Sequence, residues 1–169
     1  MKLVSFYCDI DNSNFYKNSA IRLKKQCDDL YIPNLILEEN FGNEWIDNVR
    51  AKPEFLLRMM NLLNEDFLWL DVDCNIHKKI DFELDVDWMS DVKVDDSPHD
   101  YVHFIKNTQS NKDFIIKWMN EINEQKRGSH TAFIRIYKEL NFSKIPGNYV
   151  SIGLSNIESK ANYFDNNVI

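Results

Sequence analysis

Residues 67–75 read FLWLDVDCN, an apolar run that ends abruptly in acids. The four apolar residues 67–70 lead directly into Asp71 and Asp73. A short continuous apolar run of this kind predicts a strand that is buried on both faces, as in the centre of a parallel sheet. In an open α/β sheet, ligands bind outside the carboxyl ends of the strands. We therefore expect both carboxylates at the ligand-binding edge of a central strand.

The rest of the chain alternates between strand and helix patterns around this run. That order is typical of an α/β fold, and it predicts a mostly parallel central sheet flanked by helices. The length suits a single domain, which we place at residues 1–155, with a polar C-terminal tail at 156–169. Strand patterns lie at residues 3–8, 32–40, 67–70 and 101–105, and helix patterns at 16–30, from Pro53 onward, from Ser110 onward and at 132–140.

The composition narrows the class of protein. With 44% hydrophobic and 13% aromatic residues, the chain is globular and not disordered. A net charge of −7 argues against binding to a nucleic acid backbone or to an anionic membrane surface. The N-terminus does not read as a signal peptide, and no segment approaches the ~18 consecutive apolar residues of a membrane span. We expect a cytoplasmic protein whose three cysteines stay reduced.

The chain contains three pairs of aspartates at i, i+2, and spacing alone does not distinguish them. Asp85 and Asp87 alternate with apolar residues from Phe82 to Trp88, which predicts that both acids lie on the solvent-exposed face of a strand. Asp9/Asp11 follows the first strand, where a helix cap explains it as well as a ligand site does. Asp71/Asp73 is the pair at a central strand.

Two carboxylates so close together repel each other unless a positive charge lies between them. Mg²⁺ and Mn²⁺ suit that position, because such ions take one or two carboxylates and complete their shell with water and phosphate oxygens. The context of Asp71 and Asp73 therefore favours a metal site over two solvated acids that open a turn.

Residues 54–76, EFLLRMMNLLNEDFLWLDVDCNI, resemble the D-x-D segment of nucleotide-diphospho-sugar transferases of the GT-A fold, a Rossmann-like α/β fold. Weaker similarities extend over about residues 1–152 and occur in the family's order. The chain departs from the family pattern at Ser129, where relatives often carry an Asp, and it has no His after His130 to serve as a further metal ligand. It is also short for such an enzyme. The segments are FYKNSAIRLKKQC (15–27), WIDNVRAKPEFLL (45–57), VHFIKNTQSNKDFIIKWMNEI (102–122), GSHTAFIRIYKEL (128–140) and KIPGNYV (144–150).

The resemblance implies a glycosyltransferase that uses Mn²⁺ or Mg²⁺ and a UDP- or GDP-sugar donor. Asp73 would bind the metal directly, and Asp71 would act through metal-bound water or the ribose. His130 would contact the diphosphate or the donor sugar, although it could equally be a partner to backbone near a helix start. The sequence does not specify the acceptor. It also does not specify the oligomeric state, for which a homo-oligomer is one alternative.

The same resemblance assigns the nucleotide-binding residues. Asp9, Asp11 and Tyr16 lie where the base and ribose should bind, although Tyr16 also falls on the apolar face of its helix. Arg50 and Lys52 precede the helix that begins near Pro53, where a cation could meet the diphosphate. The alternative for these two cations is ordinary surface charge.

Two other functions compete with the transferase. FYCDIDNS (6–13) resembles the D-x-D-x-T opening of haloacid-dehalogenase-like phosphatases, with Asp9 as nucleophile, Asp11 as acid/base and Ser13 in place of Thr. The later Lys and acidic pair of those enzymes would have to come from DVKVDDSP (91–98), where they are too close together to be distinct motifs. The third alternative is a non-catalytic protein of the same fold that binds a nucleotide or acts as a scaffold.

Overall fold

Strand β3 (Phe67–Leu70) lies third in a six-stranded sheet and is buried along its whole length, as the apolar run predicts. The computed structural model describes residues 1–9, 14–79, 86–92, 97–126, 128–145 and 149–152. A second sheet pairs β4 (Cys74–Ile76) with β8 (Val150–Ile152) in antiparallel fashion. In order across the large sheet, the strands are β2 (Asn34–Glu38), β1 (Lys2–Tyr7), β3, β6 (Pro98–Ile105), β5 (Trp88–Val92) and β7 (Phe142–Lys144).

The large sheet is mixed but mostly parallel. Strand β1 pairs in parallel with β2 and β3, and β5 pairs in parallel with β7. Strand β6 is antiparallel to both of its neighbours, β3 and β5. Only β6 therefore runs against the common direction among these six strands, which confirms the predicted fold class.

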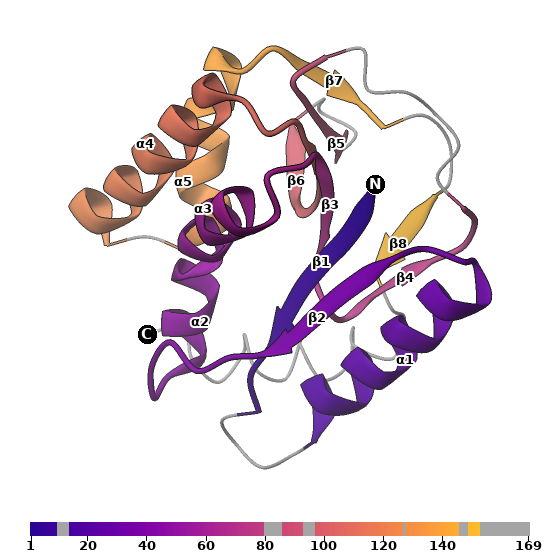
Figure 1. Cartoon of the computed structure of the whole chain (residues 1–169). Helices are drawn as coiled ribbons and strands as arrows, with labels where there is room; N and C mark the ends of the chain where they lie inside the picture. The colour runs from indigo at the N-terminus through magenta and orange to yellow at the C-terminus, as the bar shows by residue number, and fades with distance from the viewer. Residues whose placement is uncertain (10–13, 80–85, 93–96, 127, 146–148, 153–169) are drawn as a thin grey trace.

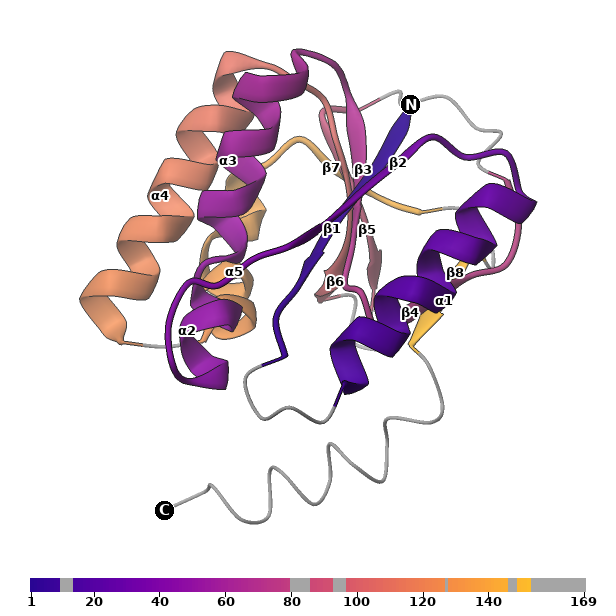
Figure 2. The ribbon, with the colours of Figure 1, turned by 60° about the horizontal axis from the view of Figure 1, so that its bottom comes forward.

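Helices cover both faces of the large sheet (Figures 1 and 2). One face carries α1 together with the β4–β8 pair, and the other carries α2, α3, α4 and α5. Two separate apolar cores follow from this arrangement, one on each side of the sheet. The helices are α1 (Phe15–Asp29), α2 (Trp45–Arg50), α3 (Lys52–Leu63), α4 (Gln109–Gln125) and α5 (Ser129–Ile136), with a 3₁₀ turn at Tyr137–Glu139.

Local sequence explains where the main elements begin and which side they bury. Helix α1 buries Ala20, Leu23 and Cys27 at helical spacing. Pro53 occupies the first turn of α3, where its missing N–H has no intrahelical partner to lose. The described helices include none that is long and apolar enough to cross a bilayer.

The structure corrects several predicted boundaries. Pro98–Asp100, expected in a loop, belong to β6, because a proline is tolerated as the first residue of a strand. Helix α4 begins at Gln109, one residue before the expected Ser110, and is capped by Thr108, whose hydroxyl accepts a hydrogen bond from the Asn111 N–H. The last helix ends at Ile136 and does not reach Leu140. The alternating strand expected at 82–88 lies largely outside the described residues, as do Asp85 and the tail at 156–169.

Candidate active site

Asp71 and Asp73 follow directly after β3, at the edge of the sheet where β1 and β3 end. The Asp71 N–H donates to the Tyr101 carbonyl of β6 at 2.8 Å, and the Cys74 N–H donates back to the Asp71 carbonyl at 2.9 Å. These bonds form a tight turn in which Val72 packs into the core on the α1 side. The Asp71 side chain keeps 27% of its surface exposed, whereas Asp73, counted as a whole residue, is buried at 4% exposure.

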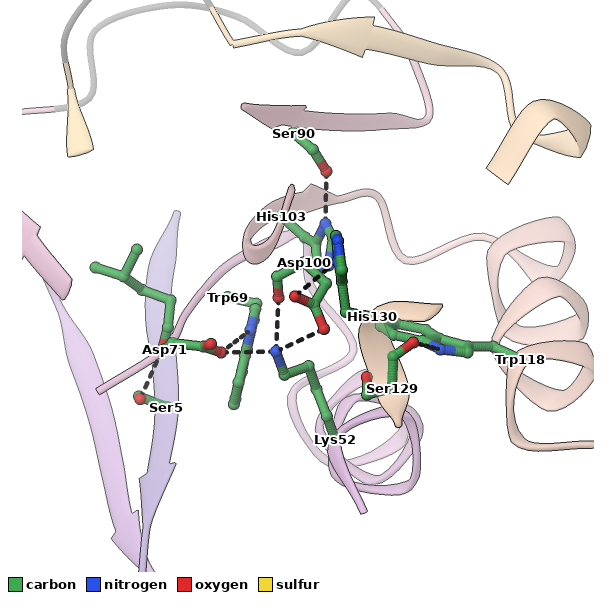
Figure 3. Close-up of polar contacts among 11 residues, drawn as sticks. Ser5, Lys52, Trp69, Asp71, Ser90, Asp100, His103, Trp118, Ser129 and His130 are labelled. Atoms are coloured by element: carbon green, nitrogen blue, oxygen red, sulfur yellow. Dashed lines mark hydrogen bonds and ion pairs between the residues drawn. The ribbon is translucent and has the colours of Figure 1, made fainter. Parts of the chain in front are cut away.

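A buried lysine offsets part of the negative charge at this edge. Lys52, the first residue of α3, is 6% exposed, and its Nζ lies 2.9 Å from Asp71 Oδ1 (Figure 3). The same Nζ donates to the Asp100 carbonyl at 2.7 Å and lies 3.2 Å from Asp100 Oδ2. The alternative of ordinary surface charge is therefore wrong for Lys52. Trp69 Nε1 also donates to Asp71 Oδ1, at 3.1 Å.

The ammonium group of Lys52 contacts two carboxylates, and the pKa values of all three groups are shifted as a result. Burial works against the charged form of Lys52, but Asp100 and Asp71 together hold its pKa above the usual range. Burial, and the negative charges of Asp100 and Asp73, raise the pKa of Asp71 to about 6 despite Lys52. Burial also disfavours the charged form of Asp100, but Lys52 and His130 hold its pKa well below its usual range. Asp100 thus stays charged to a lower pH than Asp71 does.

His130 joins this cluster from the first turn of α5. Its Nδ1 lies 3.2 Å from Asp100 Oδ1, and its side chain is 37% exposed. The structure thus brings His130, Lys52 and Asp71 together, all three of which the sequence selected. Asp100 connects them, and no feature of the sequence selected it.

His103 on β6 lies close to the same cluster but is a core residue. It is fully buried, and its Nδ1 accepts a hydrogen bond from Trp88 Nε1 at 3.1 Å. Ser90 Oγ lies 2.5 Å from that nitrogen. Burial, with the nearby Lys52 charge, lowers the pKa of His103 to about 3, so the imidazole is neutral.

Two of the residues proposed for the base and ribose, Asp9 and Tyr16, lie just after β1 and in the first turn of α1. Both carboxylate oxygens of Asp9 accept backbone hydrogen bonds from the start of α1, from Tyr16 N at 2.8 Å and Lys17 N at 3.0 Å. Asp9 therefore has the helix-capping role that was one of its two interpretations. The Tyr16 hydroxyl accepts from Trp45 Nε1 at 3.0 Å, which joins α1 to α2.

Arg50 and Lys52, the two cations predicted near the diphosphate, contact different parts of the structure. Arg50 Nη2 donates to the Lys126 carbonyl, at the end of α4, at 2.6 Å. This contact directs it toward α4, whereas Lys52 contacts Asp71 and Asp100. Asp11 lies outside the described residues, as do Ser13, Lys93, Asp95 and Asp96 of the phosphatase alternative.

Arg22 on α1 is a second residue that the sequence did not single out. Its Nη2 donates to the Asp73 carbonyl at 3.2 Å, and its Nε is buried without a hydrogen-bond partner among the described residues. Arg22 therefore fixes the backbone of the turn that carries Asp73.

Asp71 and Asp73 carry the carboxylate oxygens that hard divalent cations prefer, although Asp73 is only 4% exposed. The described residues hold no group of three or more His, Cys, Asp or Glu side chains placed for a metal. Magnesium needs only one or two carboxylates when phosphate oxygens and waters supply the other ligands. Both contacts of Asp71 described above reach the same oxygen, Oδ1.

A comparison with solved structures finds a protein of similar fold. The chain is similar to a glycosyltransferase involved in the glycosylation of the major capsid of PBCV-1, with a TM-score of 0.64 and 12% identity. The match covers 86% of this chain and 82% of that one. No protein-family model matches the chain, and neither does any curated protein sequence. At this identity the likeness concerns the fold alone.

Proposed function

We propose that the chain is a metal-dependent glycosyltransferase that moves a sugar from a UDP- or GDP-sugar to an acceptor. The observation that carries the proposal is the position of Asp71 and Asp73 at the carboxyl end of the central strand of a glycosyltransferase fold. Ligands of open α/β sheets bind at this edge. The acidic pair and the fold thus support the same function independently.

Asp73 would hold a divalent cation directly, and Asp71 would hold it through water or contact the ribose. A cation bound there neutralises negative charge on a departing nucleoside diphosphate, which is Lewis-acid assistance. Lys52 would be the second positive charge at the diphosphate, because its Nζ lies 2.9 Å from Asp71 Oδ1. Asp9, Asp11, Tyr16 and Arg50 remain predictions for the nucleotide itself.

The phosphatase alternative is weakened by how Asp9 is used. A phosphatase nucleophile needs a carboxylate oxygen directed at phosphorus, whereas both oxygens of Asp9 accept N–H groups at the start of α1. That bonding serves the helix and leaves Asp9 poorly placed to attack. The non-catalytic alternative differs from the transferase in turnover alone.

The experiment is a calorimetric titration of UDP and of GDP into the full chain, with Mn²⁺ and then with EDTA. We expect one nucleotide to bind only in the presence of Mn²⁺, and Asp73→Asn to weaken this binding at least about tenfold, because loss of a metal contact costs on that scale. Asp87→Asn is the matched control, because Asp87 belongs to another Asp-x-Asp pair and lies at the start of β5, away from Asp71.

Binding that persists in EDTA, or that is equally strong in Asp73→Asn and wild type, would contradict the metal site. Failure of both nucleotides to bind wild type under any condition would contradict the sugar-nucleotide proposal as a whole. Metal-dependent binding without release of nucleotide from UDP- or GDP-sugars would favour the non-catalytic alternative.

A further inference from the structure

Asp100 owes its position to an irregularity in β6. Strands β5 and β6 pair regularly from Trp88/Ile105 to Ser90/His103, and the register then shifts before the pair Val92/Pro98. Such bulges redirect a side chain and are over-represented next to active sites. Asp100 lies in the shifted segment, and its carboxylate contacts helices α3 and α5.

The two oxygens of Asp100 have different partners. Oδ2 lies 3.2 Å from Lys52 Nζ, and Oδ1 lies 3.2 Å from His130 Nδ1 (Figure 3). The Asp100 side chain is 15% exposed, and Lys52 and His130 keep its pKa well below the usual range in spite of burial. An anionic carboxylate beside one ring nitrogen favours the imidazole tautomer that carries its proton there. A proton on Nδ1 of His130 would face Asp100 Oδ1 across the 3.2 Å ion-pair contact, which is not an aligned hydrogen bond, and Nε2 would then be the basic nitrogen.

This pair lies next to the acids of the candidate metal site. Lys52 Nζ contacts Asp71 Oδ1 and Asp100 Oδ2 at once, so the two carboxylates are no farther apart than the sum of those two contacts. His130 keeps 37% of its side-chain surface exposed, whereas Asp100 is mostly covered. The imidazole is thus the member of the pair that a substrate can reach.

We propose that His130 is the general base of the transfer reaction and that Asp100 is the positioning residue that holds it. This inference rests on the proposed glycosyltransferase function. In the step, the acceptor hydroxyl oxygen forms a bond to the anomeric carbon while the bond from that carbon to the diphosphate oxygen breaks. The electron pair of the broken bond leaves with the nucleoside diphosphate, and the hydroxyl proton moves to His130 Nε2. Positioned bases of this kind contribute about 10²–10⁴-fold to rate.

Relatives often carry an Asp at the position of Ser129, and a serine there cannot supply a carboxylate to the site. Ser129 is fully buried, and its carbonyl accepts a hydrogen bond from Trp118 Nε1 at 2.9 Å. That contact anchors the first turn of α5 against α4 and fixes the residue that follows, His130. Asp100 reaches the site from β6 instead, and it supplies the carboxylate from a different element.

The first test reads the tautomer of His130 without any substrate. Long-range ¹⁵N–¹H correlation spectra of the labelled full chain report which imidazole nitrogen carries the proton in the neutral ring, and His130→Gln assigns the signal. We expect the proton of His130 on Nδ1 in wild type and a loss of that preference in Asp100→Asn. His103 is an internal control with the opposite tautomer, because its Nδ1 accepts from Trp88 Nε1.

The second test measures transfer to water. Release of nucleotide from UDP-glucose, UDP-galactose and GDP-mannose is followed with Mn²⁺ in wild type, His130→Gln, Asp100→Asn and His77→Gln. We expect His130→Gln to lower kcat about 100-fold or more, with KM and Mn²⁺-dependent nucleotide binding within about twofold of wild type. Asp100→Asn should lower kcat about tenfold or more at an unchanged KM. His77→Gln is the control, because His77 is an exposed histidine outside the cluster.

The outcomes separate this inference from the proposed function. Nucleotide binding and turnover that survive in His130→Gln would overturn the assignment of the base and leave the transferase intact. A wild-type His130 with its proton on Nε2 would also overturn it. Absence of metal-dependent nucleotide binding in wild type would remove the proposed function itself, while the tautomer measurement would still report the Asp100–His130 contact.

Discussion

The charge of Lys52 can be removed while its length is kept by the substitution Lys52→Met. Lys52 is 6% exposed, and its ammonium contacts the carboxylates of Asp71 and Asp100 and the Asp100 carbonyl. Removing one partner of a buried ion pair costs roughly 3–5 kcal/mol, because the other partner is left as an uncompensated charge. Asp71 keeps 27% exposure and can take up a proton, so we place the loss near the lower limit, at about 3 kcal/mol.

The penalty should depend on pH with a definite sign. In wild type the lowered pKa of Asp100 contributes stability that is present above its ordinary value of 3.8 and is lost as the pH falls toward its folded value. Without Lys52, burial raises the pKa of both carboxylates, so the folded variant binds protons that the unfolded chain has released. The difference from wild type should therefore shrink on going from about pH 7 to about pH 5, by up to roughly 1.4 kcal/mol per pH unit for each extra proton.

Urea denaturation followed by tryptophan fluorescence measures this free energy of unfolding. A loss of about 3 kcal/mol also predicts a decrease in Tm of roughly 6–12 °C for a chain of this size. Lys117→Met is the matched control, because Lys117 forms an ion pair with Glu139 while 51% exposed, and such surface pairs contribute about 0–1 kcal/mol. A loss below about 1 kcal/mol in Lys52→Met, or one that is the same at both pH values, would refute the reasoning from buried charge.

Two further stability predictions concern neighbours of Lys52. The pKa of Asp71 is raised to about 6, so its contribution to stability is present below 3.8 and is lost as the pH rises through about 6. Asp71→Asn should therefore be as stable as wild type or up to ~2 kcal/mol more stable near pH 7, although it should weaken metal-dependent nucleotide binding; urea titrations at two pH values measure the first effect and calorimetry the second. His103, with a pKa lowered to about 3, contributes stability that is present above 6.5 and is lost as the pH falls. In His103→Gln the slope of unfolding free energy between about pH 6 and pH 4 should be smaller than in wild type by up to roughly 1.4 kcal/mol per pH unit, and equal slopes would contradict a neutral buried His103.

The sequence was sufficient to predict the part of the site that depends on one strand. A strand buried on both faces must be apolar throughout, so residues 67–70 revealed both β3 and its central place in the sheet. The acids that follow such a run are necessarily at its carboxyl end. The strands β4 and β7 could not be predicted, because three residues are too few to show a periodic pattern.

Asp100 could not be predicted in this way, because its role depends on contacts that are remote in sequence. It lies 48 residues from Lys52, and the shift in β6 that redirects it leaves no pattern in a stretch that reads as a loop. The only indirect signal was Lys52 itself. A lysine at the start of an apolar helix needs an acidic partner if it is buried, but the sequence does not say which acid supplies it.

The balance of charge at the site explains why a metal should be required for nucleotide binding. Lys52 faces Asp71 and Asp100, Asp73 is close enough to raise the pKa of Asp71, and Arg22 contacts the Asp73 carbonyl, so two cations oppose three carboxylates. A nucleoside diphosphate would add further negative charge to an edge that is already negative, in a chain whose net charge is −7. Like charges in partly buried surroundings repel strongly, and a divalent cation between the carboxylates and the phosphates turns that repulsion into attraction. The excess of acid that costs stability at Asp71 is therefore the same feature that we expect to make nucleotide binding depend on the metal.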